Sequence, residues 1–154
     1  MYKIRHYIFA LLAAFALLLA GCGGKEAVKP SQESLQSKKA LETMSAMEKS
    51  YISRDMAGVM APVAQDLKSG YSEFQTSVRK DIESYSKVEL DMGVDRVEIT
   101  GDLVKVVFHW FGRWSDKDGL GHEGRGNTVF VFKDTGSSMP LQEIVGDSPF
   151  GVAR

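Results

Sequence analysis

The sequence predicts an α+β fold in which N-terminal helices pack on a curved antiparallel sheet, and three observations support this prediction. Apolar residues recur at three- and four-residue steps between residues 35 and 85, as on one face of a helix. Near Ser86 the period changes to two, which is typical of strands. The helical segments all precede the strand-like segments, and this order favours an antiparallel sheet with helices on one face.

Length and composition limit the classes of protein that this chain can represent. Its 154 residues are enough for one domain with a short appendage. The 19 basic and 20 acidic residues give a net charge of −1, which argues against a nucleic-acid-binding module. The single cysteine excludes an internal disulfide framework and any metal site built from several cysteines. We therefore expect no nucleic-acid partner, no metal and no cofactor.

The N-terminus has the pattern of a secretion signal. Lys3 and Arg5 precede an unbroken apolar run over residues 7–20, which is too short to span a bilayer and fits the apolar region of a signal peptide. The run ends in Leu19-Ala20-Gly21-Cys22, which resembles the lipobox of bacterial lipoproteins. We expect lipid on the thiol of Cys22, because two or more acyl chains give stable membrane anchoring. The alternative is an ordinary signal peptide, cleaved near Gly21, with a chance cysteine.

These features predict the organisation of the chain. Residues 1–21 form the lipoprotein signal peptide, residues 22–36 a lipidated tether rich in glycine, serine and charge, and residues 37–154 one folded domain. The expected location is the bacterial cell envelope. Lipid would anchor the chain to the inner or outer membrane, with the domain in the periplasm or at the cell surface.

Three helices are expected after the tether. The first spans about residues 35–53, with an apolar stripe of Leu41, Met44, Met47, Tyr51 and Ile52. A short second helix over 56–61 follows the N-cap residue Asp55 and ends before Pro62. The third helix has the clearest stripe, formed by Tyr71, Phe74, Val78, Ile82 and Tyr85. We interpret both stripes as core.

The period-two region divides into four strands. The first begins near Ser86, and its apolar residues change parity around Gly93–Arg96, which predicts a β-bulge. Thr100-Gly101-Asp102 predicts a hairpin turn into a long strand over 103–114. The remaining expected elements are a loop over 115–123, a strand over 125–133, a turn over 134–137 and a strand over 141–145.

This order of elements resembles the nuclear transport factor 2-like superfamily, also called the cystatin-like cone. The resemblance covers residues 38–147 and rests on four pieces, SRDMAGVM (53–60), VKVVFHW (104–110), FVFKD (130–134) and LQEI (141–144). The chain departs from the family at Met139-Pro140, where many members have tryptophan, and between Val63 and Gly70, where the family's short early strand is not evident. The resemblance implies a sheet wrapped around a long helix, an apolar pocket at the open end and frequent dimerisation through the sheet.

Candidate ligand-binding residues lie on the predicted apolar face of the strands. They are Phe108, Trp110, Trp114 and Phe130, which could line a pocket or form the sheet–helix core. Enzymes of the resembled superfamily, such as ketosteroid isomerases and polyketide cyclases, place an acidic general base inside the cone. Asp95 at the predicted bulge and Asp147 after the last strand are the candidates, but no spacing selects either, so we assign no catalytic residue.

The remaining motifs favour structural interpretations. Residues 119–124 match G-x-G-x-x-G by letter, but a strand rather than a helix follows, so we interpret the glycines as loop residues. Beyond the signal region the only histidines are His109 and His122, so a three-histidine zinc site is impossible there. His109 alternates with Lys105 and Arg113, which indicates a surface or dimer-interface position.

The long strand also predicts an association surface. Leu103, Val107 and Phe111 lie on the face opposite the apolar one, although a one-layer sheet needs only one apolar face. We expect a homodimer through this face, weakened below about pH 6.5 by protonation of His109. The function that we predict is a membrane-anchored lipoprotein binding a small ligand or envelope partner. The alternative is an isomerase- or cyclase-type enzyme using an acidic residue in the cone.

Overall fold

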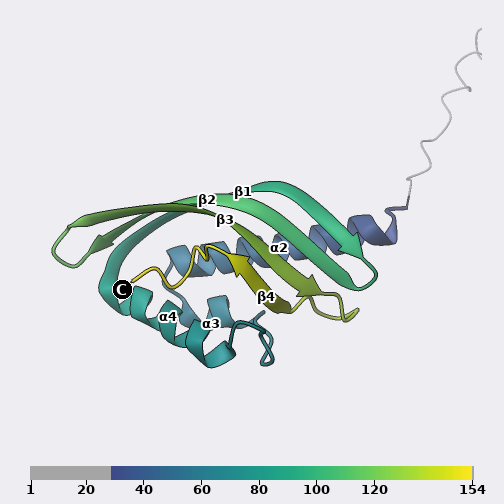
Figure 1. Ribbon diagram of the computed structural model, residues 1–154, viewed down its shortest axis with the longest axis horizontal. Helices are drawn as coiled ribbons and strands as arrows, with labels where there is room; N and C mark the ends of the chain where they lie inside the picture. The colour runs from purple at the N-terminus through teal and green to yellow at the C-terminus, as the bar shows by residue number, and fades with distance from the viewer. Residues whose placement is uncertain (1–28, 154) are drawn as a thin grey trace, which may run out of the picture. The chain divides into compact units, whose positions relative to one another are not determined.

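Helices cover one face of a four-stranded antiparallel sheet (Figure 1). The computed structural model describes residues 29–153, and the folded unit begins at Ser31. The strands lie side by side in chain order, so the predicted α+β class with N-terminal helices on a curved sheet is confirmed. The predicted signal peptide and Cys22 lie outside the described residues. Within residues 29–153, no helix has the length and apolar character needed to cross a membrane.

The first described helix, α2, spans Gln32–Ile52. It begins three residues before the expected start because the Ser31 side chain caps it, accepting a hydrogen bond from the Ser34 N–H at 3.1 Å. Residues 32–36, which the sequence placed in the tether, therefore belong to the helix. The buried side of α2 includes residues of the predicted stripe, Met44, Met47 and Tyr51.

Two shorter helices follow. Helix α3 spans Met56–Met60 and α4 spans Tyr71–Ser84, close to the predicted bounds. Phe74 and Val78 are buried on α4 as expected, but the third buried residue is Asp81 and not its neighbour Ile82, which is only partly buried. The inward face of α4 therefore carries a carboxylate among apolar side chains.

The four strands are β1 (Tyr85–Thr100), β2 (Leu103–Asp116), β3 (Gly121–Lys133) and β4 (Leu141–Gly146). The register between β1 and β2 skips one residue between Val94 and Arg96, which confirms the predicted bulge. The turn at Gly101, with φ of +63°, is also confirmed. The predicted 115–123 loop is wrong, because both strands of the hairpin continue and only residues 117–120 connect them.

The segment before α4 covers the outer edge of β4. Val63 forms a parallel bridge with Leu141, whose N–H donates to the Pro62 carbonyl at 2.7 Å. The Lys68 N–H donates to the Gln142 carbonyl at 3.0 Å. In place of the short early strand of the resembled family, this segment has one isolated bridge and a few backbone hydrogen bonds to β4.

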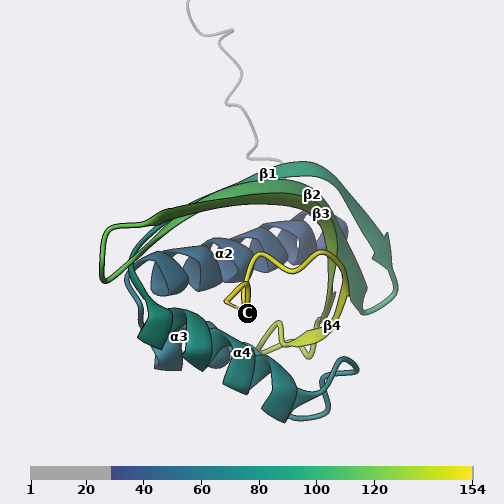
Figure 2. The same ribbon diagram turned by 60° about the vertical axis from the view of Figure 1, so that its left-hand side comes forward.

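The core lies between the sheet and the helices (Figure 2). The inner face of β2 is buried as predicted, through Val104, Val106, Phe108, Trp110 and Trp114. Across β2–β3 these residues pair with Phe132, Phe130, Thr128, Gly126 and His122. His122 therefore shares the inner face with the core aromatics, at the far end of the hairpin.

Candidate functional site

The space between the curved sheet and α4 is filled by the chain itself. Residues 147–153 follow β4 and turn back beneath the sheet (Figure 2). Phe150 in this segment is 2% exposed, and its ring meets Tyr51 edge-on with centroids 4.9 Å apart. The rings of Phe74 and Phe130 lie 6.2 and 6.0 Å from it. An aromatic side chain thus occupies the interior where the family resemblance led us to look for an apolar pocket.

Asp81 holds the 147–153 segment in place. Its carboxylate is 1% exposed and accepts three backbone hydrogen bonds of 2.5–3.0 Å, from Gly151, Val152 and Ala153. The Tyr51 hydroxyl donates to the same carboxylate at 2.5 Å and accepts from the Trp114 indole at 3.0 Å. Four donors bind this carboxylate, so Asp81 acts as a structural anchor and not as an available general base.

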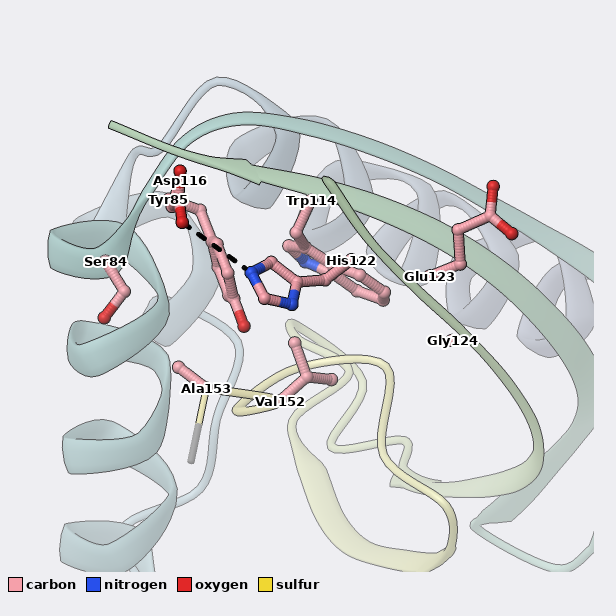
Figure 3. A pocket seen from close by; sticks show the side chains of 9 residues that line it. All are labelled: Ser84, Tyr85, Trp114, Asp116, His122, Glu123, Gly124, Val152 and Ala153. Atoms are coloured by element: carbon pink, nitrogen blue, oxygen red, sulfur yellow. Dashed lines mark ion pairs between the residues drawn. The ribbon is translucent and has the colours of Figure 1, made fainter. Parts of the chain in front are cut away.

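A half-open hollow of about 560 Å³ lies beside this segment, at the end of the β2–β3 hairpin (Figure 3). We call it the hairpin pocket, and its lining is Ser84, Tyr85, Trp114, Asp116, His122, Glu123, Gly124, Val152 and Ala153. The volume is within the range of about 300–1,000 Å³ that is typical of small-molecule sites. The α4–β1 junction, the hairpin and the 147–153 segment each supply part of the wall.

Asp116 and His122 face each other in this pocket. The Oδ1 atom of Asp116 accepts the backbone N–H groups of Asp118 and Leu120, both at 2.9 Å, so the hairpin turn fixes the carboxylate. Its Oδ2 atom lies 3.9 Å from Nε2 of His122 (Figure 3). The His122 ring also packs against Tyr85, with centroids 5.7 Å apart. A carboxylate at this position can orient the imidazole ring.

Glycines on the inner face make room for the two indole rings. A Cβ at Gly124 would lie 3.2 Å from the Trp114 ring and 3.3 Å from the Trp110 ring. A Cβ at Gly126 would lie 2.9 Å from the Trp110 ring, and one at Gly112 would overlap Trp114. The tryptophans keep their positions because these three sites carry no side chain.

This packing corrects our interpretation of the G-x-G-x-x-G letters as loop residues. Gly119 does lie in the turn, with φ of +84°. Gly121 and Gly124 belong to β3, and Gly124 lies against the tryptophan rings. Two of the three glycines are therefore strand residues and not loop residues.

Asp116 and Glu123 are the acidic side chains that line the hairpin pocket. Burial raises the pKa of the Tyr85 hydroxyl, and the charges of Asp81 and Asp116 raise it further. The Glu123 carboxylate points away from the other labelled side chains and binds Arg113 at 2.8 Å (Figure 3). In the part of the chain that the structure describes, no lysine or arginine lines the pocket.

The structure separates the four predicted ligand-binding aromatics. Phe108 and Phe130 are fully buried against each other, with centroids 4.8 Å apart, and neither lines the hairpin pocket. Trp110 is buried too, and its indole N–H donates to the Asp147 carbonyl at 2.6 Å and to Thr128 Oγ1 at 3.1 Å. Trp114 lines the hairpin pocket. A ligand-binding role stays a prediction, and its position makes Trp114 the best placed of the four.

Neither acidic residue suggested by the sequence lies inside the fold. Asp95 is at the exposed bulge, where its Oδ1 lies 2.8 Å from Nδ1 of His109. Asp147 is exposed, and its backbone carbonyl rather than its carboxylate binds Trp110. Asp81 is buried and Asp116 lines the hairpin pocket, and the sequence pattern selects neither of them.

Sequence signals for these two residues existed. Asp81 stands one residue from Ile82 in the apolar stripe of α4, and a carboxylate in such a position signals a buried polar contact. Asp116 precedes Gly119 in a pattern typical of an aspartate that caps its own turn. The 147–153 segment had no periodicity that could have placed it in the site.

The outer face of the sheet has the residues predicted for association. Leu103 and Phe111 are exposed by 37% and 39%, and Val107 is half-buried between them. The Arg113 guanidinium lies over the Phe111 ring, 5.0 Å from its centroid. Pairing through this face remains a prediction. The Asp95 carboxylate lies against His109 within the same chain, and the weakening of a dimer in acid stays a prediction.

Comparison with known proteins identifies the fold. No protein-family model matches the chain, and no curated protein matches it. Among solved structures, a nuclear transport factor 2-like superfamily protein from Salmonella enterica serovar Typhimurium is similar, with a TM-score of 0.62 and 12% identity. The match covers 77% of this chain and 94% of that one.

Two other similar structures show the range of the fold. The association domain of C. elegans CaMKII has a TM-score of 0.59 and 11% identity, covering 77% of this chain and all of that one. A hexachlorocyclohexane dehydrochlorinase has a TM-score of 0.59 and 11% identity, covering 73% and 85%. The described domain therefore has the nuclear transport factor 2-like fold that the sequence resembled, which at these identities identifies the fold alone.

Proposed function

We propose that this chain is a lipid-anchored protein of the bacterial cell envelope whose domain binds a small ligand in the hairpin pocket. The observation that carries the binding role is the pocket itself, a hollow of about 560 Å³ in which aromatic, polar and apolar side chains from three segments converge. The interior beyond it is filled by Phe150, and among the hollows of the described residues we propose this one because three segments converge on it.

Anchoring is proposed from the sequence, on Leu19-Ala20-Gly21-Cys22 after the apolar run. Replacing Cys22 with serine should abolish acyl labelling and move the protein out of the membrane fraction, because serine offers no thiol for the lipid. Metabolic labelling with a palmitate analogue, followed by fractionation, measures both effects. Unchanged labelling of Cys22→Ser would refute the proposal.

The binding role is tested by filling the pocket. Ala153 lines it and is half-buried, so Ala153→Phe should occlude the hollow while the backbone N–H still binds Asp81. Native mass spectrometry of the protein purified from its own membranes should detect a bound small molecule that Ala153→Phe lacks. Val145→Phe, on the exposed outer face, is the matched control and should keep the ligand. A ligand retained by Ala153→Phe would place binding elsewhere.

The second candidate is an enzyme that moves a proton at carbon, and Asp116–His122 favours it. Nδ1 of His122 would take the proton, because the Asp116 carboxylate lies on the Nε2 side of the ring and would stabilise the imidazolium from there. The 3.9 Å separation suits a pair that tightens when a substrate enters. The similarity to a dehydrochlorinase supports this alternative at the level of fold.

Proton exchange into deuterated water tests the enzyme alternative with small carbonyl compounds as probes. A wild-type rate that His122→Gln lowers by about a hundredfold would support it. Exchange that is equal in wild type and His122→Gln would exclude His122 as the base.

A further inference from the structure

We infer that the hairpin pocket selects a small organic ammonium ion with an apolar body. The inference rests on the proposed binding role of this pocket and names the chemical class of the ligand. It follows from the position of one carboxylate oxygen, from the charges around it and from the aromatic rings beside it.

The carboxylate oxygen is Oδ2 of Asp116. The turn N–H groups of Asp118 and Leu120 occupy Oδ1, so the carboxylate cannot rotate freely. Oδ2 makes no hydrogen bond within residues 29–153, and Nε2 of His122 is 3.9 Å away. A fixed carboxylate oxygen at the edge of a hollow is a receptor for a cationic N–H donor.

The surrounding charges favour a cation over an anion. The arginine nearest in the hairpin, Arg113, lies on the outer face and is paired with Glu123. Asp81 lies behind the apolar wall, since the N–H groups of Val152 and Ala153 bind it from the far side of the pocket. Burial is the main cause of the raised pKa of Tyr85, and the negative charges of Asp81 and Asp116 raise it further. A field that opposes a phenolate stabilises an ammonium group.

The rings and the rim define the rest of the ligand. The centroid of the Tyr85 ring lies 5.7 Å from that of the His122 ring and 6.2 Å from that of the Trp114 ring, so three adjoining aromatic groups form part of the pocket wall. Aromatic faces attract ammonium groups, most strongly where water is excluded. Val152 and Ala153 complete the wall with apolar side chains, which suit a hydrocarbon body rather than a sugar or a phosphate.

Three probes of similar size and different charge test this inference. Benzylamine, benzyl alcohol and benzoate are titrated at neutral pH into the full-length protein in a nonionic detergent, with calorimetry and amide NMR spectra as readouts. We expect protonated benzylamine to bind about tenfold more tightly than benzyl alcohol and benzoate to bind most weakly. The shifted signals should be the Trp114 indole N–H and the backbone N–H groups of Val152 and Ala153.

Two variants assign the charge preference to Asp116. Asp116→Asn keeps an oxygen for the turn N–H groups but removes the charge, so it should erase the advantage of benzylamine over benzyl alcohol. Asp118→Asn is the matched control, because Asp118 is an exposed carboxylate in the same turn that does not line the pocket, and it should leave that advantage intact. An unchanged advantage in Asp116→Asn would overturn the inference.

The outcomes separate this inference from the proposed function. Equal binding of benzylamine and benzyl alcohol would overturn the ammonium preference and leave the pocket as a small-molecule site. Tightest binding of benzoate would also overturn the ammonium preference, and it would show that the pocket prefers an anion. If no probe shifts the three signals, the ammonium inference is overturned, and the pocket-filling variant Ala153→Phe then decides independently whether any ligand binds here.

Discussion

Replacing Asp81 with asparagine should disturb one of its four hydrogen bonds, whereas alanine should remove all four. Oδ2 accepts from Tyr51, Gly151 and Val152, while Oδ1 accepts from Ala153 alone. An asparagine can place its oxygen at the Oδ2 position and keep three donors, but its NH₂ group then faces the Ala153 N–H. The two variants therefore differ by the three hydrogen bonds to the Oδ2 position, which asparagine keeps and alanine loses.

The magnitudes follow from the burial of this carboxylate. A hydrogen bond to a charged group contributes about 1.5–3 kcal/mol, so Asp81→Asn should lower the free energy of unfolding by about 2 kcal/mol. Asp81→Ala releases the 147–153 segment and should lower it by about 4 kcal/mol. With a urea slope of about 1.5 kcal/mol/M, the midpoint should fall by roughly 1.3 M for asparagine and by about twice that for alanine.

Urea unfolding followed by tryptophan fluorescence measures these shifts, because Trp110 and Trp114 are both buried. Glu83→Gln is the matched control, since Glu83 is an exposed carboxylate two residues along the same helix, and its midpoint should match wild type. An Asp81→Ala midpoint equal to that of Glu83→Gln would refute the anchoring role of Asp81.

Three further predictions concern packing, association and pH. Phe74→Ala should lower the free energy of unfolding by about 3 kcal/mol, because the ring is buried against Phe150; a urea midpoint at the wild-type value would contradict this. Val107→Glu should convert the expected homodimer to monomer in sedimentation of residues 23–154 at tens of micromolar, and a dimer indifferent to this change would place the contact elsewhere. Burial raises the pKa values of Tyr51 and Tyr85 above the unfolded value of about 10, so the stability that they confer is complete below about pH 10 and is lost as the pH rises further. The urea midpoint should therefore begin to fall near pH 10 and continue to fall above it, less steeply in Tyr51→Phe than in wild type.

The helices and the long strands could be predicted because the apolar residues in each of these segments follow a regular period. The alternation from Val104 to Trp114 fixes which face of β2 is buried, since a shift of one residue would expose every one of these side chains. The parity change in β1 placed the bulge for the same reason. The predicted start of α2 was less accurate, because it depends on one side chain, the Ser31 hydroxyl that caps the helix.

The start of β3 could not be read from local preference. Gly121, Gly124 and Gly126 are poor strand formers, and their pattern resembles a loop. They form a strand because β2 supplies the hydrogen bonds and the indole rings fill the space that their missing side chains leave. Tertiary contacts thus override local preference in this half of the hairpin.

The candidate site was even less accessible to sequence reasoning. The sequence predicts Trp114 as a candidate ligand-binding residue, but it gives His122 no functional signal and places Asp116 in an expected loop. Their meeting depends on the register of one hairpin and on the position of the 147–153 segment, and neither of these has a periodic signal. A pocket made where three non-consecutive segments meet is a property of the folded chain.

The two outer edges of the sheet also bear on the solubility of this protein. An unpaired edge strand offers its backbone to other chains and promotes aggregation. The edge at β4 is closed by the 62–68 segment, through Pro62, Val63 and Lys68. At β1 the bulge between Val94 and Arg96 breaks the regular spacing that a foreign strand would need. Straightening β1 by deleting Asp95 should therefore favour fibrous or amorphous assembly before it affects the pocket, because the inner face of the neighbouring β2 would remain intact.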